Sequence, residues 1–256
     1  MSEERQTNYT VSEGYELPSK GLIYEKKVNP RVELRSMTAR DEMKRLNPST
    51  TPLKSLADII EGCMIEKPAV HVYDMALADY DYLLHKLRVV TYGPDYAVVL
   101  RCPECGDLIE TNADLDSLSV REFDANKVEE YKTFSLPRCG RTVTIKFLTP
   151  ALMDEIEIKT KEMQRKYKTA GVDWNIFVKL RACIDLVDGN KLGVVDMEQF
   201  INNLEALDMT KILNNIDRLN SSFGLDTEFT VDCPHCGGEV HTSFRYGPEF
   251  FRPTNV

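Results

Sequence analysis

The sequence predicts an α+β chain of two tandem, internally duplicated modules, each mainly helical and each with one β-hairpin. Three observations predict this fold class. A Leu-Pro segment that ends in Gly occurs at residues 17–21 and again at 136–140. Stretches with helical spacing of apolar residues follow both segments in the same order. A Cys-Pro-X-Cys-Gly turn then closes each copy, at 102–106 and at 233–237.

The spacing within the two copies defines the expected organisation of the chain. Gly93 stands nine residues before Cys102, and Gly224 stands nine residues before Cys233, so both copies approach the Cys turn over the same length. The expected parts are a polar N-terminal arm at 1–14, module one at 15–120, a linker at 121–133, module two at 134–247 with an insertion near 186–200, and a C-terminal tail at 248–256.

Each module is expected to begin with a β-hairpin. Apolar and polar residues alternate over 31–38 in module one and over 142–149 in module two, which is the pattern of a half-buried strand. Each of these strands follows a Leu-Pro segment ending in Gly, and the two together predict a hairpin.

Three helices are expected after each hairpin. The first begins after Thr38 in module one and after Thr149 in module two, because Thr is a favourable N-cap, and Pro150 suits the first helical position. The third covers 77–92 and 207–223, and the Gly that follows is expected to end it. The second helix has one apolar face in each module, formed by Leu56, Ile59, Ile60 and Cys63, and by Ile176, Phe177, Leu180, Cys183 and Ile184.

The two Cys turns together predict a zinc site. Zn²⁺ in structural sites takes four tetrahedral ligands, and thiolates are among the ligands it prefers. One turn supplies only two sulfurs, whereas both turns supply Cys102, Cys105, Cys233 and Cys236. Two modules packed about a pseudo-twofold axis would place the turns side by side. The alternative is one ion for each turn, completed by His241 or Cys139.

Two other kinds of chemistry compete with zinc at these cysteines. A dithiol oxidoreductase needs its first Cys at the start of a helix, but Gly237 and Gly238 predict a turn into a strand. Structural disulfides need an oxidising compartment, and the polar start at 1–9 has no signal-peptide pattern, so we expect a reducing cytosol.

Charge and composition restrict the function further. Lys and Arg number 32 and Asp and Glu number 41, which gives a net charge of −9 and argues against a nucleic-acid binder. The alternative function is a zinc-ribbon regulator that binds nucleic acid or polymerase. Such a regulator would need a basic face on this acidic chain. The sequence contains no apolar run long enough for a membrane span. We find no catalytic motif and expect a protein that is not an enzyme.

Several of these motifs resemble a known family. The motifs are Leu17-Pro18-Ser19-Lys20-Gly21 with Tyr24 behind it, the strand 32–38 followed by Asp41-Glu42, the helix end 87–93, and Cys102-Pro103-Glu104-Cys105. They resemble the baseplate hub and hub-assembly proteins of contractile-tailed, T-even-like bacteriophages. The resemblance is clearest over 15–120, and in the second copy it covers the segment from the third helix to the Cys turn.

The resemblance implies a role in virion assembly. Such a protein would be a non-enzymatic component of the tail baseplate hub or a factor that helps the hub form, and it would be made in the host cytoplasm and act at the virion tail baseplate. Its implied partners are other hub or spike proteins, the tape-measure protein, and further copies of itself in the hub. No direct contact with nucleic acid or membrane is implied.

Overall fold

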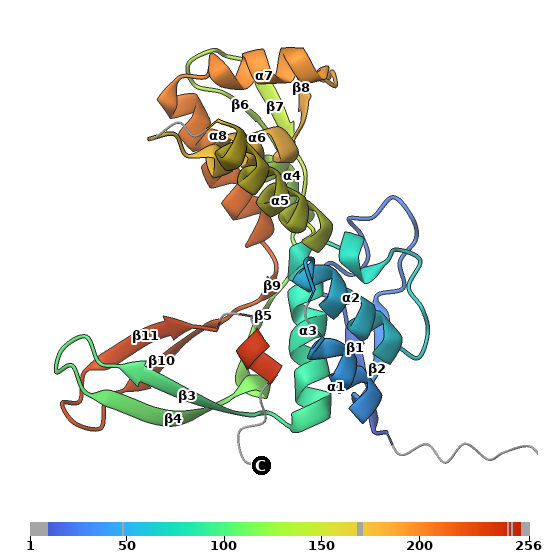
Figure 1. The fold of residues 1–256 in the computed structure, drawn as a ribbon, viewed down its shortest axis with the longest axis vertical. Helices are drawn as coiled ribbons and strands as arrows, with labels where there is room; N and C mark the ends of the chain where they lie inside the picture. Colours follow the sequence, from blue (N-terminus) through green and yellow to red (C-terminus); the bar gives the residue numbers. More distant parts are fainter. Residues whose placement is uncertain (1–9, 48, 168–170, 245, 247, 252–256) are drawn as a thin grey trace, which may run out of the picture.

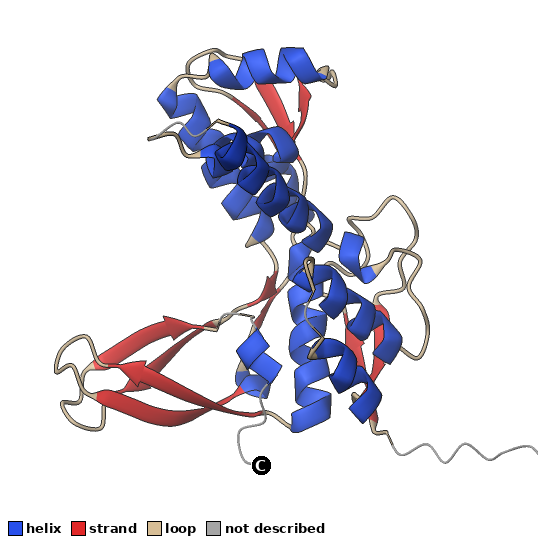
Figure 2. Ribbon diagram, viewed as in Figure 1, coloured by secondary structure: helices blue, strands red, loops and turns tan. Residues whose placement is uncertain are grey.

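The computed structural model describes residues 10–47, 49–167, 171–244, 246 and 248–251. Figure 1 shows two lobes and a projecting arm. Lobe one contains the helices α1 to α3, lobe two contains α4 to α8, and the arm consists of residues 95–114 and 228–243. Figure 2 shows that the arm is built of strands, whereas helices dominate both lobes. Mixed helices and small sheets confirm the α+β class.

Lobe one begins with a hairpin and continues with helices. Its elements are β1 (Ser12–Glu16), β2 (Arg31–Arg35), α1 (Ala39–Arg45), α2 (Pro52–Cys63), the 3₁₀ turn η1 (Val72–Asp74) and α3 (Leu77–Tyr92). As expected, Thr38 caps α1: its hydroxyl accepts from the Asp41 N–H, and the Asp41 carboxylate accepts from the Thr38 N–H at 3.0 Å. Helix α3 ends at Gly93, which has φ +85°.

Lobe two surrounds a three-stranded antiparallel sheet with the order β6-β7-β8. Its elements are α4 (Ala125–Lys132), β6 (Thr133–Ser135), β7 (Thr142–Ile145), α5 (Pro150–Lys166), α6 (Trp174–Cys183), β8 (Ile184–Val187), α7 (Val194–Asn202) and α8 (Ala206–Asn220). Helix α5 starts as expected, since the Thr149 hydroxyl accepts from the Leu152 N–H at 3.1 Å and Pro150 follows it. The expected insertion near 186–200 contains the end of β8 and most of α7, so this segment forms part of a strand and part of a helix.

The arm consists of two antiparallel hairpins that face each other. They are β3 (Asp95–Arg101) with β4 (Leu108–Asp114), and β10 (Glu228–Asp232) with β11 (Glu239–Ser243). Alternate residues point between the hairpins, so Tyr96, Val98 and Phe229 are partly buried and pack against the core of lobe one. The short elements η2 (Leu115–Ser117), β5 (Val120–Arg121), β9 (Gly224–Leu225) and η3 (Pro248–Phe251) connect the arm to the lobes.

Three parts of the chain differ from the sequence-based division. Strand β1 begins at Ser12, inside the expected polar arm, because it pairs with β2; residues 1–9 lie outside the described part. The expected linker 121–133 contains α4, which buries Val128 in the core of lobe two. In the expected tail, Phe250 and Phe251 are buried in the core of lobe one.

The third helix of the second copy also ends earlier than expected. Helix α8 ends at Asn220, and Gly224 lies in β9, where its φ is +107°. A Cβ atom at Gly224 would lie 2.9 Å from the Cβ of Ala78 in α3. Gly224 is therefore required for a close approach between two segments, and it does not terminate the helix.

The two cores do not follow chain order. Leu17, Leu83 and Leu115 share the core of lobe one with Phe244 and Phe250 from the other end of the chain. The second Cys hairpin thus packs with lobe one, although the sequence assigns it to module two. None of the helices in the described residues is both long enough and apolar enough to cross a membrane.

The lobes meet around the start of α3. The Leu77 N–H donates to the Leu148 carbonyl at 2.8 Å, and the Tyr73 hydroxyl donates to Asp154 at 3.0 Å. Strands β5 and β9 pair antiparallel beside this contact. The Cys turns lie at the far end of the arm, away from the joint between the lobes (Figure 1).

Candidate metal centre

Each Cys turn is a tight loop between two strands. The Cys102 N–H donates to the Asp107 carbonyl at 2.9 Å, and the Gly106 N–H donates back to the Cys102 carbonyl at 3.0 Å. The second turn repeats both bonds, from Cys233 to the Gly238 carbonyl at 2.8 Å and from Gly237 to the Cys233 carbonyl at 2.9 Å. These turns leave both sulfurs of each pair on the same side.

Glycine is necessary at the fifth position of both turns. Gly106 has φ +79° and Gly237 has φ +75°, a backbone region that residues with a Cβ rarely adopt. Proline at the second position fixes φ near −65°. The Cys-Pro-X-Cys-Gly pattern therefore encodes the turn itself as well as the two ligands.

The fold brings the four turn cysteines together. Their Sγ atoms all lie within 4.8 Å of one another. Cys102 Sγ is 3.6 Å from Cys236 Sγ, and Cys105 Sγ is 3.7 Å from Cys233 Sγ. A tetrahedral ion with Zn–S bonds of about 2.3 Å separates its sulfurs by roughly 3.8 Å, whereas a disulfide bond is about 2.05 Å long. The spacing fits a tetrahedral metal ion and does not fit disulfides.

The four sulfurs differ in exposure. Cys102 and Cys233, which follow the strands, are 1% and 2% exposed, whereas Cys105 and Cys236 are exposed. Ile109 and Val240 pack against the buried pair and form a small apolar cluster at the tip of the arm. The cluster thus contains one buried cysteine of each turn, while the other cysteine of each turn is exposed.

The electrostatics of the cluster favour a bound cation. The backbone N–H groups of Cys105 and Glu104 lower the pKa of the Cys102 thiol to about 7. The Asp107 N–H favours the Cys105 thiolate, but desolvation and the three neighbouring sulfurs outweigh it and raise the pKa of Cys105 to about 12. Four thiolates this close repel one another, and a dication removes that repulsion.

Glu104 is a neighbour of the cluster that the sequence pattern does not reveal. It lies inside the first turn, and its Oε2 atom is 3.9 Å from Cys236 Sγ in the second turn. The same carboxylate lies against Gly238, where an added Cβ would collide with Oε2. Only the pairing of the two turns in space brings these residues together.

The other candidate ligands lie elsewhere. Cys139 is in the β6–β7 turn of lobe two, where its N–H donates to Asp208 at 3.0 Å. His241 is on the outer face of β11, and its Nδ1 is 2.9 Å from the Thr230 hydroxyl oxygen. Cys63 and Cys183 are buried in helix interfaces, as expected. The alternative with two separate ions would need Cys139 or His241 at a turn, and neither is in the cluster.

The local secondary structure also tests the dithiol alternative. Strand β3 ends at Arg101 and β4 begins at Leu108, while β10 ends at Asp232 and β11 begins at Glu239. No helix begins at either turn, so the cysteines lack the helix dipole that activates the first thiol of such enzymes.

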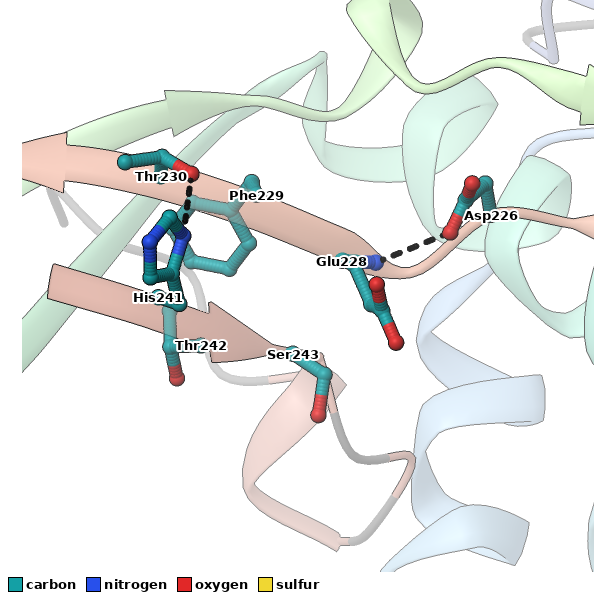
Figure 3. Close-up of a pocket in the computed structure, with 7 residues that line it drawn as sticks. All are labelled: Asp226, Glu228, Phe229, Thr230, His241, Thr242 and Ser243. Carbon is teal, nitrogen blue, oxygen red and sulfur yellow. Dashed lines mark hydrogen bonds between the residues drawn. The ribbon is translucent and has the colours of Figure 1, made fainter.

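A polar hollow of about 980 Å³ lies beside the second hairpin (Figure 3). It is lined by Asp226, Glu228, Phe229, Thr230, His241, Thr242 and Ser243. Thr230 and His241 are directly opposite in the β10–β11 register, and the Glu228 N–H donates to Asp226 at 3.3 Å. Two hydrogen bonds therefore join lining residues of the hollow, one across the strands between Thr230 and His241 and one along the chain between Glu228 and Asp226.

Comparison with known proteins adds one finding. The model of a family described as T4 bacteriophage base plate protein matches residues 11–252. The matched region includes both lobes and the whole arm. Searches of curated proteins and of solved structures found no match.

Proposed function

The chain belongs to the family of T4 bacteriophage base plate proteins, and from this premise we propose that it is a non-enzymatic component of the baseplate hub or a hub-assembly factor. Its arm would be held by one structural Zn²⁺ at Cys102, Cys105, Cys233 and Cys236. Its partners would be other hub or spike proteins, the tape-measure protein and further copies of the chain. It would be made in the host cytoplasm and act at the virion tail baseplate.

The single observation that carries the zinc proposal is the spacing of the four sulfurs. All lie within 4.8 Å of one another, and two cross-hairpin distances of 3.6 and 3.7 Å match a tetrahedral edge. When bound, the ion would bond four thiolates and cross-link the two hairpin tips. Four protein ligands fill the shell of Zn²⁺, whereas a catalytic site keeps one position open. The role we assign to the metal is therefore structural.

The binding role follows from the shape that this cross-link would maintain. Apart from the apolar cluster at the tip, the hairpins pack together mainly near lobe one, where Tyr96 of β3 contacts Phe244, the residue after β11, edge to face with ring centroids 5.6 Å apart. Cross-linked at the tip, the arm would project as a rigid two-layered element. A rigid projection loses little conformational entropy when it docks, which favours a role in assembly.

We also propose that the two halves arose by duplication. An isolated bridge joins Leu34 in β2 to Met64, the residue after α2. At the matching place in the second half, Ile145 in β7 pairs with Ile184, the residue after α6. Strand β8 extends this pairing in lobe two. The same cross-connection after the same helix supports a common origin for the halves.

Zinc content and assembly test the proposal separately. Elemental analysis of the purified chain should give about one zinc per chain, and no metal after extensive dialysis without chelator would reject the zinc site. Co-expression with the other hub proteins should yield a complex that contains the chain. A chain that contains zinc but never enters a hub complex would reject the baseplate role that we assign.

The alternative of a zinc-ribbon regulator has a specific weakness. Residues 95–114 and 228–243 together carry eight acidic side chains and one basic side chain, Arg101. All eight carboxylates are exposed. The surface around the metal site is therefore acidic, which disfavours contact with phosphates.

A further inference from the structure

An apolar groove lies between α5 and α6 on lobe two. Its volume is about 380 Å³. Its floor is formed by Leu152, Met163, Phe177, Val178 and Ala182. Val178 is buried, and the other four are only partly covered by the core of lobe two. The groove therefore exposes apolar surface that nothing else in the described chain covers.

Cations surround this floor. Lys146, Lys159, Lys166 and Arg181 line the groove, together with Glu155 and Glu162. Lys159 pairs with Glu155, and Arg181 pairs with Glu198 at 3.2 Å. Within the described residues, Lys146 and Lys166 form no ion pair with a carboxylate. Lys166 lies over the Tyr167 ring, with its Nζ 5.0 Å from the ring centroid. An apolar floor with two cations that lack a carboxylate partner fits an apolar surface that carries negative charge.

The arm offers a surface of that kind. On the outer face of β3–β4, Val99 is 62% exposed and Leu108 is 56% exposed. Glu110 is directly opposite Val99 in the register, and Leu108 is the next outward residue on the same strand. Residues 95–114 and 228–243 carry −7 of the net charge of −9. Apart from Asp95, none of the eight arm carboxylates pairs with a Lys or Arg among the described residues.

We propose that the outer face of β3–β4 docks into the α5–α6 groove of a second copy of this chain. Val99 and Leu108 would cover the apolar floor, and Glu110 would approach Lys146 and Lys166. The two surfaces belong to one sequence and complement each other in both polarity and charge. Within one chain they lie apart, because the arm projects from lobe one and the groove is on lobe two (Figure 1).

If each arm enters the groove of the other chain, the two copies form an isologous dimer. If the contact is made in one direction only, it is heterologous and either closes into a ring or continues as a filament. The inference rests on the proposed function, which names further copies of the chain as partners, and it assigns the two surfaces that would meet. Its test uses the purified chain alone and needs no other hub protein. Failure of hub assembly and failure of self-association are therefore observed in different experiments.

Sedimentation velocity of the purified full-length chain tests the proposal. At low salt the average mass should rise above that of one chain as concentration increases. At about 1 M salt, where the screening length is about 3 Å, the mass should fall towards that of one chain. Glu110→Lys should weaken association at least about tenfold, because it replaces an attraction with a repulsion. The double variant Lys146→Glu with Lys166→Glu should do the same.

A mixing experiment gives the decisive result. The Glu110→Lys chain retains a normal groove, and the Lys146→Glu/Lys166→Glu chain retains a normal arm, so a mixture should associate although neither chain does so alone. Glu228→Lys is the matched control, because it makes the same charge change on the other hairpin and should leave association unchanged. Circular dichroism and zinc content verify that each variant is folded.

Three outcomes would overturn the proposal. The first is a wild-type chain that stays monomeric at its highest soluble concentration. The second is equal weakening by Glu110→Lys and Glu228→Lys, which would indicate a general effect of charge. The third is a mixture of the two folded variants that remains monomeric.

Discussion

Asp79 and Asp208 occupy the same place in the two halves of the chain, since each is the third residue of its helix and each binds the turn of its own β-hairpin. Asp79 accepts from the Ser19 N–H at 3.0 Å, and Asp208 accepts from the Arg138 N–H at 2.8 Å. Both carboxylates are fully buried. Each ties a Leu-Pro turn to the start of α3 or α8, which supports the duplication we propose.

Removal of either carboxylate should destabilise its own lobe. Asp79→Ala leaves the Ser19 N–H and the hydroxyls of Ser19 and Tyr24 without their buried acceptor. Asp208→Ala leaves the backbone N–H groups of Arg138 and Cys139 without their buried acceptor. We expect a loss of about 1–3 kcal/mol in the free energy of unfolding in each case.

Urea denaturation can assign this loss to a lobe. The single Trp of the chain, Trp174, lies in lobe two. Its fluorescence transition should move to lower urea in Asp208→Ala and much less in Asp79→Ala. The exposed Glu66→Ala is the control and should change stability by less than about 0.5 kcal/mol. Equal shifts of the Trp174 transition in both Asp variants would contradict the assignment.

Loss of one thiolate should loosen the arm and leave the joint between the lobes intact. Cys105→Ser should abolish stoichiometric zinc, and zinc binding contributes on the order of 10 kcal/mol in small zinc domains. Far-UV circular dichroism should keep its helical signal, because the helices lie in the lobes. Hydrogen exchange should accelerate in β4 and β11, while the Leu77 amide at the joint keeps its protection.

Cys139→Ser is the matched control for this prediction. Cys139 is an exposed thiol outside the cluster, so its replacement should change neither zinc content nor exchange in the arm. If Cys105→Ser kept one tightly bound zinc, the assigned ligand set would be wrong.

The contribution of His85 to the stability of lobe one should fall as the pH drops through the range from 6.5 to 4. Burial lowers the pKa of His85 to about 4, and its Nε2 is 2.9 Å from the Leu115 carbonyl oxygen. Because the pKa is lower in the folded state than the unfolded value of about 6.5, the unfolded state binds the proton first. The contribution of His85 is complete above pH 6.5, and up to about 3 kcal/mol of it is lost by pH 4.

Comparison with His85→Gln isolates this contribution from other titrating groups. The difference in unfolding free energy between the wild type and the variant should be constant between pH 7 and 8. It should then shrink or reverse as the pH falls towards 4. A difference that does not vary with pH would show that His85 does not titrate in this way.

Gly224→Ala should disturb the contact between β9 and α3. The new Cβ would lie 2.9 Å from the Cβ of Ala78, and φ +107° is unfavourable for Ala. Gly171→Ala shares the positive φ, at +93°, but its Cβ would meet no atom of the described residues within 4 Å. Thermal unfolding should show a larger loss at 224 than at 171, and the excess measures the steric contact. Equal losses would mean that backbone strain alone acts at Gly224.

The sequence predicts the local elements well. Thr38 and Thr149 cap α1 and α5 as expected, and α3 has the expected bounds, because capping residues and apolar spacing act over one or two turns. The four clustered cysteines were also named from their pattern. Their pairing in space could be expected only because zinc needs four ligands and each turn offers two.

The sequence-based division fails where contacts are long-range. The Arg88 guanidinium is buried and donates to the Phe250 carbonyl at 3.2 Å, although 162 residues separate them. Nothing near Phe250 in the sequence indicates that it belongs to lobe one. Helix α4 was missed because Val128 is its only buried residue, which gives a weak apolar face. Gly224 has the sequence context of a helix end, and only the position of Ala78 explains it.

The discontinuous core of lobe one also sets an order of events during protein synthesis. Cys105 leaves the ribosome 128 residues before Cys233, which corresponds to roughly 6–26 s at ordinary elongation rates. Throughout that time the first hairpin lacks its partner and lobe one lacks Phe250 and Phe251. All core residues of lobe two are synthesised before the last core residues of lobe one. Lobe two would therefore finish folding before lobe one, although most of it is made later. The arm and its metal site would close only after residues 228–243 emerge.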